Sequence, residues 1–109
     1  MRIVQGAVLA VTVCCNYDCS LKGEIRTFEL SESAPEALLV TPRQALGYFV
    51  QSQSAIVTVA SDMPYLPKYE KGINPSSIRD LPIDRSKMVI SAKDMLFPNL
   101  DHFLAHKER

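Results

Sequence analysis

The sequence predicts an α+β fold in which a small, mostly antiparallel sheet of four to five strands is packed by two helices. Short apolar runs of strand length alternate with two segments whose apolar residues recur at helical spacing. Most connections are too short or too irregular for repeated crossover helices, which favours antiparallel pairing. Because 109 residues are the size of one core, we expect a single globular domain over residues 1–109.

The first predicted strand covers residues 3–14. Val8 and Ala10 would point to one face of the sheet, and Leu9, Val11 and Val13 to the other. A strand that is apolar on both faces is typical of a central position, covered on each side. A polar loop then leads to a second predicted strand over residues 24–30, so the two segments are expected to form a hairpin.

A helix is predicted over residues 42–53, because Thr41 is a candidate N-cap and Pro42 occupies the first helical position. Gly47 weakens it by ~1 kcal/mol relative to Ala. Further strands are expected over residues 55–60 and 87–91, and 37–40 is a possible fifth strand. The residues expected to be buried are Val11, Val13, Phe49, Ile56, Val57 and Val59.

The segment 62–86 differs in character, because it holds four of the seven prolines. We expect a long loop, and long loops in small domains are often functional. A final helix is predicted over residues 94–107, with Ser91 and Asp94 as a capping pair.

Charge and cysteine content narrow the classes of function. Twelve basic and twelve acidic residues give no net charge, which argues against duplex nucleic acid or an anionic membrane as partner. The uncharged run Ile3–Tyr17 is shorter than the ~20 residues of a spanning helix, and we interpret it as a buried strand rather than a targeting segment. Three cysteines are an odd number, which favours a reduced, cytoplasmic chain.

Two combinations of cysteine and histidine residues are candidates for chemistry. Cys15 and Cys19 have C-x3-C spacing, and His102 and His106 would leave the same face of a helix, as in a Cys2His2 zinc site. The distance between the two pairs is unlike that of a zinc finger, so we predict no metal. Whether these four residues converge stays open. The second combination is Cys19 as a nucleophile with a histidine as its base. No local sequence motif of a thiol enzyme surrounds Cys19, and the carboxylate of Asp18 beside it would disfavour the thiolate.

Asp80 and Asp84 form a carboxylate pair, but Arg79 and Arg85 adjoin them, so loop ion pairs are the simpler interpretation. Glycine-rich phosphate-binding motifs are absent from the sequence. We therefore assign no catalytic residue and no cofactor.

The loop residues Tyr65, Lys68 and Tyr69 are the strongest candidates for partner binding, because tyrosine offers large contact area and neighbouring prolines pre-order the backbone. Phe103 on the last helix is a further candidate, and a homodimer is expected through part of residues 95–104 or 62–71. The sequence thus favours a small, non-enzymatic binding or regulatory module that acts through this loop. The alternative is a small enzyme or ligand-binding protein with a pocket between the sheet and the helices.

Overall fold

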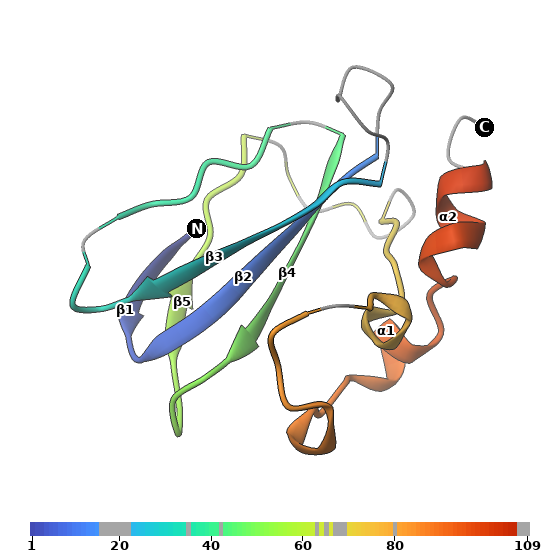
Figure 1. The fold of residues 1–109 in the computed structure, drawn as a ribbon. Coiled ribbons are helices and arrows are strands. Elements are labelled where there is room, and N and C mark those ends of the chain that lie inside the picture. The colour runs from blue at the N-terminus through green and yellow to red at the C-terminus, as the bar shows by residue number, and fades with distance from the viewer. Residues whose placement is uncertain are drawn as a thin grey trace.

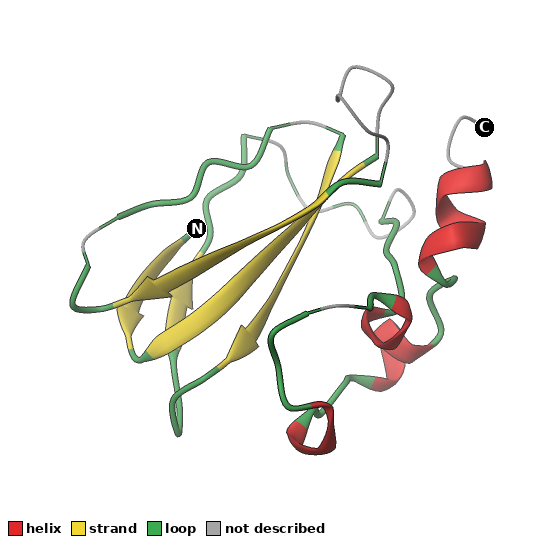
Figure 2. Ribbon diagram, in the orientation of Figure 1, coloured by secondary structure: helices red, strands yellow, loops and turns green. Residues whose placement is uncertain are grey.

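The structure is a computed structural model that describes residues 1–15, 23–34, 36–41, 43–62, 64, 66, 70–79 and 81–106. Within these residues it contains five strands and two short α-helices, which confirms the α+β class (Figure 2). The strands are β1 (Arg2–Gln5), β2 (Ala7–Cys14), β3 (Ile25–Ser31), β4 (Gln44–Val50) and β5 (Ile56–Thr58). The helical elements are the 3-10 turns η2 (Pro75–Ser77) and η3 (Arg85–Lys87), and the helices α1 (Ala92–Met95) and α2 (Leu100–His106).

β2 is the centre of a three-stranded antiparallel sheet with the order β3-β2-β4. Val8 is paired with Leu30 on one side and with Val50 on the other, and this register continues to the far end of the strand. From Val8 to Cys14 every residue of β2 is buried. The predicted central strand is therefore confirmed, and so is its hairpin with β3.

β1 and β5 form a second, two-stranded antiparallel sheet, in which Ile3 is paired with Val57. The predicted strand 3–14 is divided here because Gly6 has a φ of +88°. This conformation suits glycine, and a Cβ at position 6 would also overlap the carbonyl oxygen of Ser54. Gly6 thus lets the chain pass from one sheet to the other against the backbone that precedes β5.

The central sheet is covered on both faces. On the face that we call inner, Val8, Ala10 and Leu30 pack with Ile3 of β1 and the partly buried Val57 of β5. On the outer face, the C-terminal segment packs against the sheet (Figure 1). The buried residues of this outer cluster are Val11, Val13, Cys15, Ile78 and Leu81, with Phe49, Leu100 and Phe103 packed against them.

The prediction of a helix over residues 42–53 is wrong, because this segment contains β4, which pairs with β2 along its whole length. Helical propensity was weak there, with a glycine at position 47 and aromatic residues after it, and tertiary pairing outweighs such a preference. Arg43 has a φ of 72°, so the backbone turns immediately before the strand starts. The N-cap signal at Thr41 and Pro42 therefore precedes a strand.

The short predicted strands are corrected in part. Residues 55–60 do contain β5, but the strand predicted over 87–91 is absent from the described chain, which has η3 at Arg85–Lys87 instead. In the run 37–40, Ala37 makes only an isolated bridge to Arg2. Because β5 lies at the edge of a two-stranded sheet, two residues of this run that were expected to be buried are exposed: Ile56 is 51% exposed and Val59 61%.

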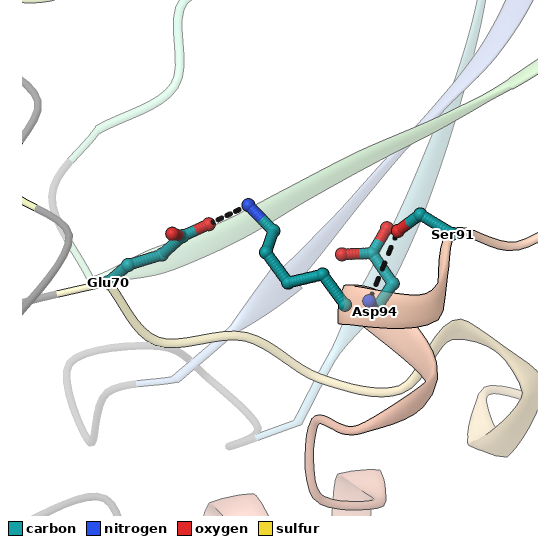
Figure 3. Close-up of polar contacts among 4 residues, drawn as sticks. Glu70, Ser91 and Asp94 are labelled. Atoms are coloured by element: carbon teal, nitrogen blue, oxygen red, sulfur yellow. Dashed lines mark hydrogen bonds and ion pairs between the residues drawn. The ribbon is translucent and has the colours of Figure 1, made fainter.

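The C-terminal region is more ordered than a loop followed by one helix. Ile78 and Leu81, inside the predicted loop 62–86, are buried against the sheet. The predicted helix 94–107 is divided into α1 and α2, with Pro98 between them. The predicted cap is confirmed, since the Ser91 hydroxyl accepts a hydrogen bond from the Asp94 amide at 3.1 Å (Figure 3).

An ion pair connects the first turn of α1 with the segment that precedes η2. The ammonium of Lys93 lies 2.7 Å from a carboxylate oxygen of Glu70, whose side chain points toward α1 (Figure 3). The Asn74 amide reaches the same helix, donating to the Met95 carbonyl at 3.2 Å. These contacts hold the chain before η2 beside α1.

Candidate functional site

The inner face of the three-stranded sheet changes character along the strands. Side chains directly opposite each other in an antiparallel sheet share a face, so the even-numbered residues of β2, β3 and β4 lie together. At one end Val8 and Leu30 are buried under β1 and β5. The opposite end carries mostly polar side chains, and we call it the polar end: Thr12, Glu24, Arg26, Gln44 and Tyr48, with the aliphatic Leu46 between the last two.

Small side chains of the central strand lie between larger ones of the two outer strands. Thr12 is paired with Arg26 on one side and Leu46 on the other, and Ala10 is paired with Phe28 and Tyr48. Ala10 and Thr12 are buried, whereas Tyr48 is 47% exposed. The larger side chains therefore stand above the smaller ones, with their functional groups reachable from solvent.

Arg26 and Glu24 form an ion pair at the edge of this surface. The guanidinium lies 3.5 Å from the Glu24 carboxylate, and the arginine side chain is 62% exposed. At this exposure the pair contributes little to stability, because solvent screens both charges. It does restrict the orientation of a permanently charged group with several donors, which suits recognition of phosphate or carboxylate.

The polar end combines groups that act on oxyanions and on protons. Tyr48 has a phenol that can donate or accept a proton, and Arg26 supplies a fixed cation. Gln44 and Thr12 add an amide and a hydroxyl, which donate and accept hydrogen bonds. In the described part of the chain, no group of three or more His, Cys, Asp or Glu side chains is arranged to hold a metal ion.

Three of the predicted partner-binding residues, Tyr65, Lys68 and Tyr69, lie outside the described residues. The fourth, Phe103, is half-buried on α2 and packs against the outer core cluster. Its apolar surface is thus used partly within the chain, and its role in partner binding stays a prediction. Met95 and Leu96, which begin the predicted dimer segment 95–104, are 60% and 86% exposed.

The predicted cysteine–histidine combinations are tested only in part. Cys14 is disulfide-bonded, contrary to the fully reduced chain expected from the cysteine count. Cys15 is a buried thiol that forms no disulfide, and its Sγ donates to the Val13 carbonyl at 3.5 Å. His102 is exposed on α2, whereas Cys19 and the side chain of His106 lie outside the described residues. Whether Cys15, Cys19, His102 and His106 converge therefore stays open.

The carboxylate pair also lies partly outside the described residues, because Asp80 is not among them. Asp84 caps η3, accepting hydrogen bonds from the Ser86 amide at 3.0 Å and the Ser86 hydroxyl at 2.6 Å. These bonds give Asp84 a local structural role.

Sequence reasoning did not single out any residue of the polar end. Tyr48 and Gln44 were hidden by the helical interpretation of their segment, in which they would not share a face with β2. The signal that identifies them is alternation. On the face that they share with the even positions of β2, residues 44–50 carry Gln44 and Tyr48, and residues 24–30 carry Glu24, Arg26 and Phe28, interspersed with leucine and valine.

Comparison with protein families gives a match that covers nearly the whole chain. The family model described as dTDP-4-dehydrorhamnose 3,5-epimerase matches residues 1–102. Comparisons with curated proteins and with solved structures found no match. A family defined by an enzyme overturns the expectation of a non-enzymatic binding or regulatory module, and supports the alternative of a small enzyme. The chain belongs to the dTDP-4-dehydrorhamnose 3,5-epimerase family.

Proposed function

We propose that the chain is an enzyme that moves protons at the carbons beside a sugar ketone, with a sugar carried on a nucleoside diphosphate as its substrate. The observation that carries the proposal is the family match over residues 1–102. In a 4-dehydro sugar, C3 and C5 both adjoin the C4 carbonyl, so their protons are acidic. Removing such a proton gives an enolate, and returning a proton to the opposite side inverts the carbon.

This chemistry needs few protein groups. A base accepts the proton, an acid returns one, and a donor stabilises the negative charge that develops on the ketone oxygen. The substrate and product are isomers, so no oxidant or reductant is consumed. The proposal therefore retains the prediction that no cofactor is required.

The polar end of the inner face supports this assignment. We assign proton transfer to the Tyr48 hydroxyl, because it is the titratable group that stands beside the small residue Ala10. Arg26 is assigned to the diphosphate, and Glu24 is a positioning residue that holds its guanidinium. Phe28, directly across Ala10 from Tyr48, offers an aromatic surface to the sugar or the base.

We assign no role in the proposed reaction to the exposed histidine among the described residues. His102 lies on α2, and this helix packs through Leu100 and Phe103 against the outer face of the sheet. The candidate site is on the inner face. A base on α2 would therefore lie on the wrong side of the sheet for a substrate held at Tyr48.

Three further predictions from the sequence remain part of the proposal. We propose that residues 1–109 form one globular domain and that the chain is a homodimer. We also propose that it works in the cytoplasm, where the enzyme would encounter an activated sugar. The disulfide at Cys14 weighs against the last of these. Among the described residues, no helix is long and apolar enough to cross a membrane.

Titration with dTDP tests where the substrate binds. We expect amide NMR signals of Thr12, Arg26 and Tyr48 to shift on adding dTDP, and Arg26→Gln to weaken binding. Val89→Ala is the matched control, because Val89 is 96% exposed and lies outside the sheet. Shifts confined to the C-terminal segment, or equal binding by Arg26→Gln, would contradict the assignment of the inner face.

A further inference from the structure

Thr12 is an exception in the central strand. β2 reads AVLAVTVC from Ala7 to Cys14, and Thr12 is its one hydroxyl residue. Of the described residues that are buried, Thr12 is also the one whose side chain carries an oxygen or nitrogen atom, and it is 4% exposed. Burying a hydroxyl costs free energy unless it is hydrogen-bonded, and a valine of nearly the same shape would avoid that cost. Packing alone therefore does not account for a threonine at this position.

The hydroxyl of Thr12 has no hydrogen-bond partner within the described part of the chain. Every fully buried side-chain oxygen or nitrogen in that part does have one. The small accessible part of Thr12 must therefore include its oxygen. Because alternate residues of a strand share a face, Thr12 lies on the same side as Ala10, and its oxygen opens onto the inner face at the polar end.

Thr12 lies between the two groups that the proposed function assigns to the substrate. Arg26 is directly opposite Thr12 on β3, with Cβ atoms about 4.5–5.5 Å apart, and Tyr48 is a diagonal neighbour on β4, about 7–8 Å away. The Arg26 side chain is 62% exposed and Tyr48 47%, so both reach further into solvent than Thr12 does. A sugar whose diphosphate contacts Arg26 and whose ring reaches Tyr48 would pass over the Thr12 hydroxyl.

We infer that the Thr12 hydroxyl is the donor that stabilises the ketone oxygen of the substrate as it becomes an enolate. The inference rests on the proposed function, whose reaction requires a donor at this oxygen. When the proton leaves C3 or C5, the electron pair of the broken C–H bond forms a double bond to C4, and the C4 oxygen takes up the negative charge. The Thr12 O–H donates a hydrogen bond to this oxygen and keeps its own proton. Return of a proton to the carbon restores the ketone.

Burial and rigidity suit Thr12 to this role. Threonine is branched at Cβ, which restricts its χ1 angle, and β2 is held between β3 and β4. A donor fixed in this way needs no reorganisation when charge develops, and the low dielectric of a buried site strengthens its hydrogen bond. A ketone oxygen is a single protruding atom, small enough to reach a hydroxyl that is so little exposed.

Replacing the hydroxyl by a methyl group tests this role. We expect Thr12→Val to lower the turnover number by about 10²–10³-fold, the usual effect of losing one oxyanion donor. The KM should stay unchanged, because the hydrogen bond strengthens only as charge develops. The melting temperature should stay the same or rise, since no internal hydrogen bond is lost. Thr12→Ser keeps the hydroxyl and should retain most of the turnover.

Thr27→Val is the matched control. Thr27 is exposed on β3 and is paired with Val11 of the outer cluster, so it lies on the opposite face of the same sheet. The same chemical change at this position should alter neither the turnover number nor the KM. Circular dichroism establishes that all three variants are folded.

Three kinetic results would overturn the inference. The first is a Thr12→Val variant that turns over as fast as the wild-type chain. The second is a rise in KM alone, because the hydroxyl would then bind the ground state of the substrate. The third is a Thr12→Ser variant as slow as Thr12→Val, because the hydroxyl would then not be the group that acts.

Infrared spectroscopy of the bound ketone separates failure of this inference from failure of the proposed function. The C4 carbonyl stretch of dTDP-4-dehydrorhamnose, identified by ¹³C labelling at C4, is compared between the wild-type chain and Thr12→Val. A hydrogen bond to the ketone oxygen lowers this frequency, so we expect the lower value in the wild-type chain. The measurement requires binding but no turnover. If the wild-type chain binds the sugar without turnover, the proposed reaction fails, and equal frequencies in the two proteins would overturn the contact with Thr12 as well.

Discussion

Phe28 of β3 and Tyr48 of β4 lie on the same face of the sheet, one on each side of the small residue at position 10. This relationship links the fold to the proposed chemistry. The central strand needs small or branched side chains to be covered on both faces, and the strands beside it can carry larger polar ones. The result is a surface on which a phenol and a guanidinium stand above buried Ala10 and Thr12.

Removing the Tyr48 hydroxyl should stop proton transfer without unfolding the chain. We expect Tyr48→Phe to lower the turnover number by about 10²–10⁴-fold, the usual contribution of a positioned acid or base. The KM should change little, because the ring remains. Steady-state kinetics and thermal melting check this. A variant with wild-type turnover would remove Tyr48 from the mechanism.

Neutralising Arg26 should act on binding rather than on turnover. We expect Arg26→Gln to raise KM or the Kd for dTDP by about 10–100-fold, since charge-assisted contacts contribute ~1.5–3 kcal/mol each. Glu24→Gln should have a smaller effect in the same direction, because it loosens the arginine without removing its charge. Calorimetric titration of the three proteins with dTDP measures this. An effect of Glu24→Gln that exceeds that of Arg26→Gln contradicts the assigned roles.

Leu9 should be among the most costly residues to truncate. It is 2% exposed on the outer face of the central strand. We expect Leu9→Ala to reduce the free energy of unfolding by about 2–5 kcal/mol, from lost burial and the cavity left behind. Val89→Ala, at a position 96% exposed, should change it by no more than about 0.5 kcal/mol. Urea denaturation followed by circular dichroism compares them.

Two glycines in the described strands and turns should respond differently to the same substitution. Gly6→Ala should destabilise the chain by about 1–3 kcal/mol, because position 6 has positive φ and a Cβ would meet the Ser54 carbonyl. Gly47→Ala should be neutral or slightly stabilising, because its Cβ meets nothing within 4 Å. Equal melting temperatures for the two variants would argue against the turn between β1 and β2.

Much of the fold was predictable from local pattern. The two-sided apolar character of residues 3–14 identified the central strand, and the polar loop before residue 24 identified the hairpin with β3. The capping pair at Ser91 and Asp94 is a local interaction, and it was found for that reason. What failed depended on contacts distant in sequence. No local sequence pattern in Gln44–Val50 indicates that this segment pairs with β2, and the preceding Thr41 and Pro42 resemble a helix start.

The candidate site was missed for the same reason. Arg26, Thr12 and Tyr48 come from three strands, and they meet only through the register of the sheet. Motif-based reasoning searches for residues close in sequence, and it therefore singled out the loop residues Tyr65, Lys68 and Tyr69 instead. The enzyme class rests on the family match, since no recognisable spacing of catalytic residues in the sequence indicates it.

The most direct test of the central claim is exchange of substrate protons with solvent. The wild-type chain is incubated with dTDP-4-dehydrorhamnose in D₂O, and the C3 and C5 proton signals are followed by NMR, with Tyr48→Phe and heat-denatured protein alongside. We predict that the wild-type chain removes both signals as deuterium is incorporated, and that neither control does so. Retention of both signals by a folded wild-type chain that binds dTDP would contradict the proposed enzymatic function and leave a ligand-binding protein.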